Sequence, residues 1–148
     1  MWLYQKKVIS AISDILEGSY GFIYITTHIP TGKKYLGKKS LYHNVKKKLT
    51  KKELAEQTGR GRKSTTQTIQ KESDWKTYYG SEEFIKQKIK EGKQEEFTRE
   101  IIHFVPNKKL LTYFECKYQF QLGVLESNEW LNTNILGKFF AKDFVTQK

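Results

Sequence analysis

The sequence predicts an α+β fold, a three-stranded antiparallel sheet flanked by helices. Residues 22–27 are β-branched and aromatic, and a turn separates them from a second extended stretch, which is the pattern of a β-hairpin. Residues 97–105 have a similar composition and stop before a proline, so they supply the third strand. Apolar residues recur at helical spacing near residues 81–90 and 108–125, which predicts two helices. Three strands form about the smallest sheet that is stable on its own.

The hairpin brings two tyrosines onto neighbouring strands. Residues 30–32 (Pro-Thr-Gly) have turn chemistry, because proline presets φ and glycine permits a positive φ. Tyr24 lies in the strand before this turn and Tyr35 in the strand after it, where side-chain alternation assigns each to one face. The hairpin therefore presents both phenols with several lysines beside them.

Capping residues mark the expected helix starts. Thr50 is followed by Glu53 three positions later, the pattern of a capping box, which predicts a short helix there. Asn107 is the expected cap of the helix that extends to about residue 125. Gly92 ends the helix over residues 81–90, because glycine adopts the left-handed conformation of a helix C-terminus.

We interpret residues 1–148 as a single domain, because this length suffices for one hydrophobic core. Residues 1–19 form an N-terminal arm, either a short helix or an extended segment. A basic insertion covers about residues 45–72. Within it, residues 59–66 contain two glycines and lack apolar periodicity, which indicates a basic loop that becomes ordered on a phosphate backbone.

Positive charge is concentrated in one segment. The net charge is +11, and residues 33–63 carry twelve Lys or Arg against two Glu. Such a block is typical of a surface that binds a polyanion. The alternative is a solvated lysine-rich surface. A membrane-surface helix fits less well, because this segment lacks large hydrophobic residues opposite its lysines.

Other classes of protein are disfavoured by composition. No apolar run approaches the roughly 18–20 residues of a membrane span, and the N-terminus lacks the apolar core of a signal peptide. The single cysteine, Cys116, rules out an internal disulfide framework and suits a reducing compartment such as the cytoplasm. The histidines are scattered without a cysteine pair, which argues against a structural zinc site. They are His28, His43 and His103.

The hairpin also resembles a known family. Ile23-Tyr24, ten further residues and then Tyr35-Leu36-Gly37 with Lys38 resemble the motif pair of the GIY-YIG nucleases. The match departs from the family at Phe22, where glycine is usual, and at Leu36, which replaces isoleucine. Further similarity to the phage and homing branch extends the resemblance over about residues 20–140. It includes Tyr79-Gly80-Ser81, Gly92-Lys93, 97–101, Glu115 and Asn134.

The resemblance implies a divalent-metal-dependent endonuclease acting on double-stranded DNA, of the phage, homing or restriction type, in a bacterial or phage-infected cell. The composition favours a site for one ion, because the few aspartates lie in separate segments: Asp14, Asp74 and Asp143. In the family, one glutamate binds Mg²⁺ or Mn²⁺, and Glu115 matches it. Glu115 falls just outside the apolar stripe of its helix. The alternative is a boundary residue paired with a lysine.

Tyr24 and Tyr35 match the two family tyrosines. A phenol is a poor base at neutral pH, but neighbouring cations favour the phenolate, and we expect Lys38 and Lys39 to lower its pKa. Tyr35 is preferred as the general base, and the other tyrosine would orient water or phosphate. The alternative is that both rings only pack in the core.

The family's phosphate-binding arginine has no direct match, because Val45 stands at its position. The nearest arginines, Arg60 and Arg62, are equal candidates, since a guanidinium binds two phosphate oxygens at once. The lysines expected to contact the DNA backbone are Lys39, Lys46, Lys47, Lys48 and Lys63. Asn134 resembles a late family asparagine that supports the site from behind, with turn capping as the alternative.

Two other functions compete with catalysis. A non-catalytic nucleic-acid-binding module on the same fold would keep the basic segment, and a structural ribonucleoprotein component needs only basic and aromatic composition. Glu115 favours the enzyme, because binding alone needs no partly buried carboxylate. The departures at Phe22 and Val45 favour the binding module.

Overall fold

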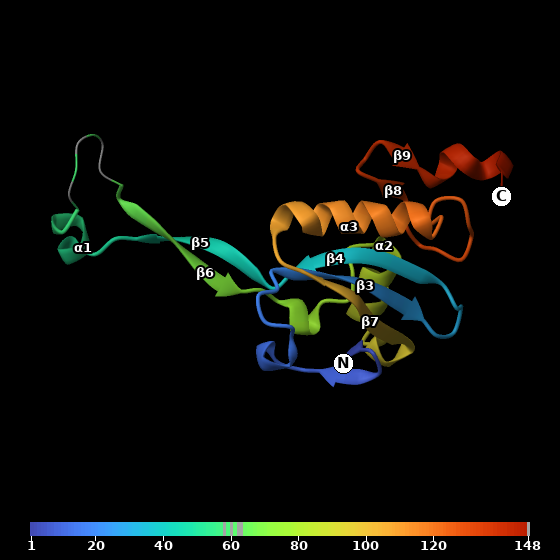
Figure 1. Ribbon diagram of the computed structural model, residues 1–148. Coiled ribbons are helices and arrows are strands. Elements are labelled where there is room, and N and C mark those ends of the chain that lie inside the picture. The colour runs from blue at the N-terminus through green and yellow to red at the C-terminus, as the bar shows by residue number, and fades with distance from the viewer. Residues whose placement is uncertain (58, 60, 62–63, 148) are drawn as a thin grey trace. The chain divides into compact units, whose positions relative to one another are not determined.

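The computed structural model describes residues 1–57, 59, 61 and 64–147, and the chain forms two compact units. The main unit comprises Met1–Leu41 together with Asp74–Lys148, and the inserted unit comprises Tyr42–Ser73. Figure 1 shows the elements of each unit along the chain. In the described part of the chain, no helix is long and apolar enough to cross a membrane.

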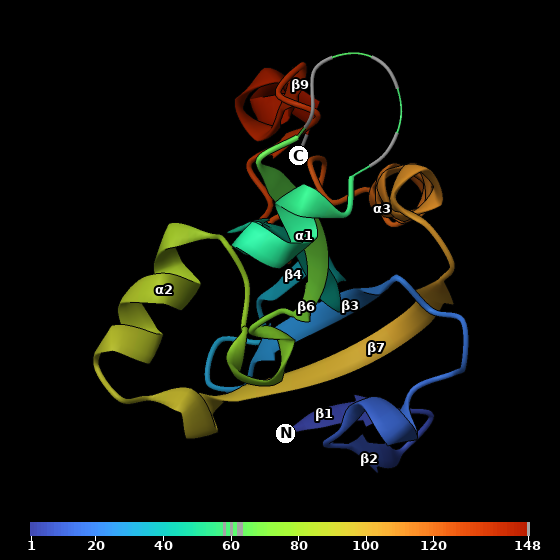
Figure 2. The same ribbon diagram turned by 90° about the vertical axis from the view of Figure 1, so that its left-hand side faces the viewer.

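The main unit is built on a five-stranded mixed sheet. Its strands are β1 (Trp2–Tyr4), β2 (Lys7–Ile9), β3 (Gly21–His28), β4 (Lys34–Ser40) and β7 (Phe97–Val105). Their order is β2-β1-β7-β3-β4, so β4 lies at one edge. Strand β3 is antiparallel to both of its neighbours, and Figure 2 shows β3 and β7 side by side. Strand β1 runs parallel to β7.

The α+β class is confirmed, but the prediction of three strands was wrong. The two additional strands, β1 and β2, come from the N-terminal arm. The turn between them places Gln5 and Lys6 at φ values of 50° and 70°. Such turns usually contain glycine or asparagine. Neither residue occurs here, so the sequence carried no local signal for this hairpin.

Two helices pack on the main sheet, α2 (Glu83–Lys90) and α3 (Lys108–Gln121). Asn107 caps α3 as predicted, because its Oδ1 accepts a hydrogen bond of 2.9 Å from the Leu110 N–H. Helix α3 stops before the expected residue 125, and Gly123 follows in the left-handed conformation at φ 60°. The short elements are 3₁₀ helices Ile12–Asp14, Trp75–Thr77, Gln94–Glu96 and Ala141–Gln147 and strands β8 (Asn134–Ile135) and β9 (Phe139–Phe140).

The sheet is covered on both faces. Ile23 belongs to a buried cluster with Leu111 of α3, which runs along the sheet beside β4 (Figure 1). The segment before α2 covers the opposite face, where its Trp75 and Tyr78 rings meet those of Phe22 and Tyr24 edge-on at centroid distances of 6.3 and 6.1 Å. The alternation predicted for the first hairpin strand is therefore confirmed, and the tyrosine face is packed with aromatic rings.

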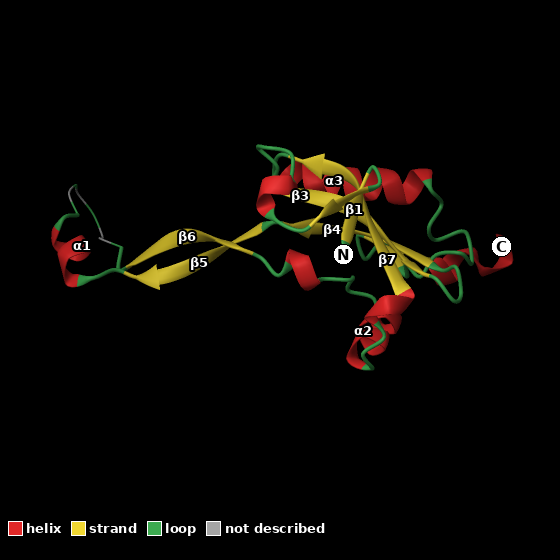
Figure 3. Ribbon diagram, turned by 90° about the horizontal axis from the view of Figure 1, so that it is seen from below, coloured by secondary structure: helices red, strands yellow, loops and turns green. Residues whose placement is uncertain are grey.

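The inserted unit is a β-hairpin with a short helix (Figure 3). Strands β5 (Tyr42–Lys48) and β6 (Thr66–Glu72) are antiparallel, and the helix α1 (Lys51–Ala55) follows β5. The capping box is confirmed, since Thr50 and Glu53 exchange two hydrogen bonds of 3.2 Å. Both strands carry almost only polar side chains, so the periodicity of a half-buried strand is missing from this part of the sequence.

Candidate active site

A hollow of about 450 Å³ lies at the edge of the main sheet beside β4. Tyr35 and Lys38 of β4 line it, together with Glu115 of α3 and Ser81, which precedes α2. Residues 132–134, 136 and 137, around β8, complete the wall. Tyr35 and Lys38 belong to opposite faces of β4, and both reach this hollow because β4 is an edge strand. The structure thus brings Tyr35, Lys38, Glu115 and Asn134 together, as the sequence predicted.

Glu115 is half-buried in the wall of this hollow. Burial raises the pKa of its carboxyl group, while the Lys38 ammonium and a hydrogen bond from the Lys38 backbone N–H partly oppose that effect. The Lys38 ammonium itself donates a hydrogen bond of 2.8 Å to Thr112 Oγ1. The protein therefore offsets only part of the cost of burying the Glu115 charge, and a cation bound nearby would stabilise the charged form further.

The donor atoms around Glu115 suit one hard divalent ion. Among the described residues, no three His, Cys, Asp or Glu side chains gather into a metal-binding group. The hollow instead offers the Glu115 carboxylate with oxygen donors from Ser81, Glu82 and Asn134 in the same lining. Mg²⁺ is commonly bound by one or two carboxylates, with water and substrate phosphate as its other ligands. The residues present fit such an ion.

The two family-type tyrosines lie close together on one face, with ring centroids 6.3 Å apart. Gly37 makes room for them, because a Cβ atom there would lie 2.6 Å from the Tyr24 hydroxyl oxygen and 2.9 Å from the Tyr35 ring. Tyr24 is 0% exposed, whereas Tyr35 is half-buried and its hydroxyl shares a hydrogen bond of 2.8 Å with Ser81 Oγ. Tyr35 is therefore the phenol that reaches the hollow.

The expected lowering of the tyrosine pKa values was wrong. Burial raises the pKa of Tyr35 above its usual 10.0 and that of Tyr24 well above it. The lysines do not offset this effect, since neither is among the groups that lower the pKa values of these two tyrosines. Lys38 bonds to Thr112, and Lys39 forms an ion pair of 2.5 Å with Asp74. Both phenols are therefore neutral at neutral pH.

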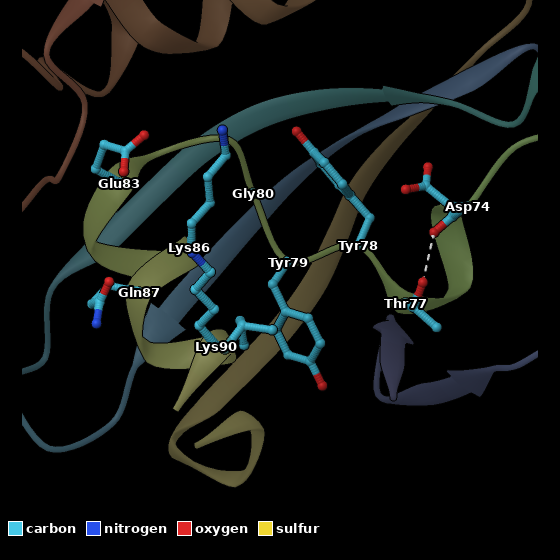
Figure 4. A pocket seen from close by; sticks show the side chains of 10 residues that line it. Asp74, Thr77, Tyr78, Tyr79, Gly80, Glu83, Lys86, Gln87 and Lys90 are labelled. Atoms are coloured by element: carbon cyan, nitrogen blue, oxygen red, sulfur yellow. Dashed lines mark hydrogen bonds between the residues drawn. The ribbon is translucent and has the colours of Figure 1, made fainter. Parts of the chain in front are cut away.

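A third phenol, Tyr78, joins the pair and was not singled out from the sequence. Tyr24 and Tyr78 share a hydrogen bond, and their ring centroids are 6.1 Å apart. The Lys39 ammonium lies 4.1 Å from the centre of the Tyr78 ring. Figure 4 shows the hydroxyls of Tyr78 and Tyr79 pointing in opposite directions. Two consecutive tyrosines in an extended segment must point to opposite sides, and this pattern in the sequence could have indicated that one of them faces the site.

Buried side chains hold the segment that carries Tyr78. The guanidinium of Arg99, 3% exposed, lies between the rings of Trp2 and Tyr79, at 4.4 and 4.0 Å from their centroids. Four backbone carbonyls of residues 75–79 accept side-chain hydrogen bonds. These run from Trp2 Nε1 to Trp75, from Arg99 Nη1 to Lys76 and Tyr78, and from Thr26 Oγ1 to Tyr79, at 2.6–3.0 Å. This arrangement fixes Tyr78 beside Tyr24.

Two asparagines near the hollow have different partners, and Asn132 is the one that binds the buried backbone of β4. Asn132 is 5% exposed, and its amide binds both backbone groups of Leu36, accepting from the N–H at 3.1 Å and donating to the C=O at 2.9 Å. Asn134 is exposed and accepts a hydrogen bond from the Gly137 N–H, so it caps a turn at the rim of the hollow. The turn-capping alternative therefore describes Asn134 in this structure.

Replacing Asn132 by alanine should destabilise the protein by about 2 kcal/mol or more, because two buried backbone groups of Leu36 lose their partner. Asn134→Ala should cost under about 1 kcal/mol, since its partner is open to water. Urea denaturation of both variants measures the difference. Equal stability of the two variants would contradict this role for Asn132.

The predicted DNA contacts are distributed over both units. Lys46, Lys47 and Lys48 are exposed on β5 of the inserted unit, and Val45 lies in the same strand rather than on a helix. Arg60, Arg62 and Lys63 lie outside the residues that the structure describes.

The chain matches a family model described as "Putative endonuclease segE, GIY-YIG domain" over residues 2–135. The comparisons found no matching curated protein and no matching solved structure. The matched range contains the complete main sheet, both of its helices and most of the hollow's lining. On this evidence, the chain belongs to the GIY-YIG endonuclease family.

Proposed function

We propose that this chain is a divalent-metal-dependent endonuclease that hydrolyses phosphodiester bonds in double-stranded DNA, with Mg²⁺ or Mn²⁺ as its ion. The observation that carries the proposal is the half-buried Glu115 carboxylate, which lines one hollow with Tyr35 and Lys38 at a sheet edge. A binding surface alone has no use for a carboxylate whose burial opposes its charge. The family membership supports the same reaction class.

Glu115 would hold the ion, with Ser81, Glu82 and Asn134 offering further oxygen donors in the lining of the hollow. A bound divalent ion supplies charge stabilisation at the phosphoryl oxygens and lowers the pKa of a water molecule. The chain's own contribution is to keep this carboxylate in place. The backbone N–H of Lys38 does so by donating a hydrogen bond to it.

We assign Tyr35 as the residue that acts on the attacking water. Its hydroxyl is bonded to Ser81 and lines the hollow that contains Glu115. Once this phenol has lost its proton to solvent, the phenolate can accept the proton of a water held there. Tyr24 packs against Tyr35 and is bonded to Tyr78, so it sets the position of Tyr35 rather than reaching the substrate. Lys38 adds positive charge beside the phosphate, and Thr112 fixes its ammonium.

The basic residues supply affinity for the DNA backbone. Lys39 and the exposed lysines of β5 are the proposed contacts among the described residues, and Arg60, Arg62 and Lys63 are further proposed contacts. Contacts of this kind make binding strongly salt-dependent and largely independent of base sequence.

Incubation of supercoiled plasmid DNA with the protein tests the proposal directly. Nicked or linear products should form with Mg²⁺ or Mn²⁺ and should be absent with EDTA, because the hydrolysis requires the ion. A gel separates the products. A protein that binds DNA but leaves varied substrates intact with either ion would instead be a non-catalytic binding module on this fold.

A further inference from the structure

A second hollow, of about 260 Å³, adjoins the active site in the main unit. Lys38 lines both hollows. The second one also contains Lys39 of β4 and Lys108 from the first turn of α3, with the hydroxyl-bearing Tyr20, Ser40 and Tyr78. Its described lining holds three lysines and no carboxylate, so the depression is positive, and Asp74 offsets part of this charge by pairing with Lys39.

The two hollows have opposite charge character. The active-site hollow has Glu82 and Glu115 against Lys38, so it suits a cation. The second hollow suits an anion, and two of its lysines are held in place. The ammonium of Lys39 lies 4.1 Å from the Tyr78 ring centre and pairs with Asp74, while Lys38 bonds to Thr112. Lysines that are already ordered lose less side-chain entropy when they bind.

In the described part of the main unit, lysines are the cationic side chains available to bind an anion, because no arginine is free to do so. The sequence contains three arginines, and only Arg99 belongs to this unit. Its guanidinium is buried and donates to two backbone carbonyls. A lysine ammonium binds phosphate as a point charge, so several converging lysines are needed where an arginine is missing.

We propose that this lysine hollow, defined by Lys38, Lys39 and Lys108, binds a backbone phosphate of the DNA strand that is cut, next to the phosphate at Glu115. The inference rests on the proposed function and extends it by assigning a neighbouring phosphate subsite. The shared lining residue, Lys38, lies between the two phosphates. The subsite positions the strand so that the reacting bond reaches Glu115 and Tyr35.

Lys108 offers a matched control in its neighbour Lys109, which is also exposed in the first turn of α3 but does not line the hollow. Lys108→Gln and Lys109→Gln remove the same charge from the same helix end, so their effects on helix stability should match. Affinity for a fluorescent 20-base-pair duplex is measured by anisotropy in EDTA over a series of salt concentrations.

Lys108→Gln should weaken binding about five- to tenfold at 0.1 M salt and reduce the slope of log affinity against log salt by about 0.9, the loss of one phosphate contact. Lys109→Gln should leave the slope close to that of the wild type, and Lys108→Arg should restore it. Equal slopes for the two Gln variants would overturn the subsite.

Inorganic phosphate distinguishes a backbone subsite from a general anion site. Inorganic phosphate at millimolar concentration should bind too weakly to displace the duplex from the protein. Saturable phosphate binding that Lys108→Gln abolishes, without any change in duplex affinity, would overturn the assignment to DNA. Because these measurements are made in EDTA, they are independent of cleavage. A wild type that shows the Lys108 effect but never cuts DNA rejects the nuclease and retains the subsite.

Discussion

Glu115→Gln is expected to abolish DNA cleavage while leaving DNA binding intact. Glutamine keeps the size of the side chain and its capacity to accept the hydrogen bond from Lys38 N–H, but it lacks the charge that holds a divalent ion. Loss of several kcal/mol of transition-state stabilisation corresponds to a decrease of at least about 10³-fold in rate. Affinity should stay equal or rise, because a charge that repels phosphate is removed. Gel cleavage and anisotropy measure the two effects on the same preparation.

The thermal stability of Glu115→Gln distinguishes two roles for Glu115, that of a metal ligand and that of a structural ion-pair partner. Burial raises the pKa of Glu115 in the folded protein above its value in the unfolded chain. The free energy of unfolding of the wild type therefore decreases as the pH rises between these two pKa values, because the carboxylate is more costly to bury once it is charged. At pH 7 and without metal, the Gln variant should melt no lower than the wild type. Any advantage should vanish in acid below the unfolded pKa, where the wild-type carboxyl is protonated in both states. Glu100→Gln, an exposed change on β7, is the control.

Full cleavage by Glu115→Gln at ordinary Mg²⁺ concentration would reject the one-ion site. A clear loss of stability at pH 7 would show that Glu115 serves the fold through Lys38. Loss of cleavage together with normal folding and binding is the combination that only a catalytic carboxylate produces.

Local signals explain which elements could be predicted from the sequence. The β3–β4 hairpin, the strand β7 and the helix starts at Thr50 and Asn107 all follow from turn, pattern and capping residues that act within a few positions. The hairpin formed by β1 and β2 has a turn through Gln5 and Lys6, residues that do not specify it. Its strands are instead stabilised by pairing with β7, which is distant in the sequence.

Prediction of the site was limited by burial, which depends on the tertiary structure. Asn132 and Asn134 are two positions apart and chemically identical, yet only Asn132 lies against the buried backbone of Leu36. The tyrosine pKa values were expected to follow from the nearby lysines. Their direction is set instead by desolvation, because the aromatic packing that covers Tyr24 comes from distant segments.

Tyr35→Phe is expected to lower the cleavage rate by about 10²-fold or more while the fold is retained, because the change removes only the hydroxyl that faces the hollow. Since the pKa of Tyr35 is raised above 10.0, the wild-type rate should rise with pH through the neutral range, by roughly tenfold per unit at most. The Phe variant should lose that rise. Single-turnover cleavage at several pH values measures both quantities.

Tyr24→Phe provides the matched comparison, since it removes a phenol hydroxyl that is fully buried and bonded to Tyr78. It should cost about 1 kcal/mol of stability, reduce cleavage by less than tenfold and leave the pH dependence unchanged. A variant at Tyr35 that keeps the wild-type pH dependence would assign the base to another group, such as ion-bound water. Equal losses of activity at both positions would show that Tyr24 also reaches the substrate when DNA is bound, and wild-type rates at both would reduce the pair to packing residues.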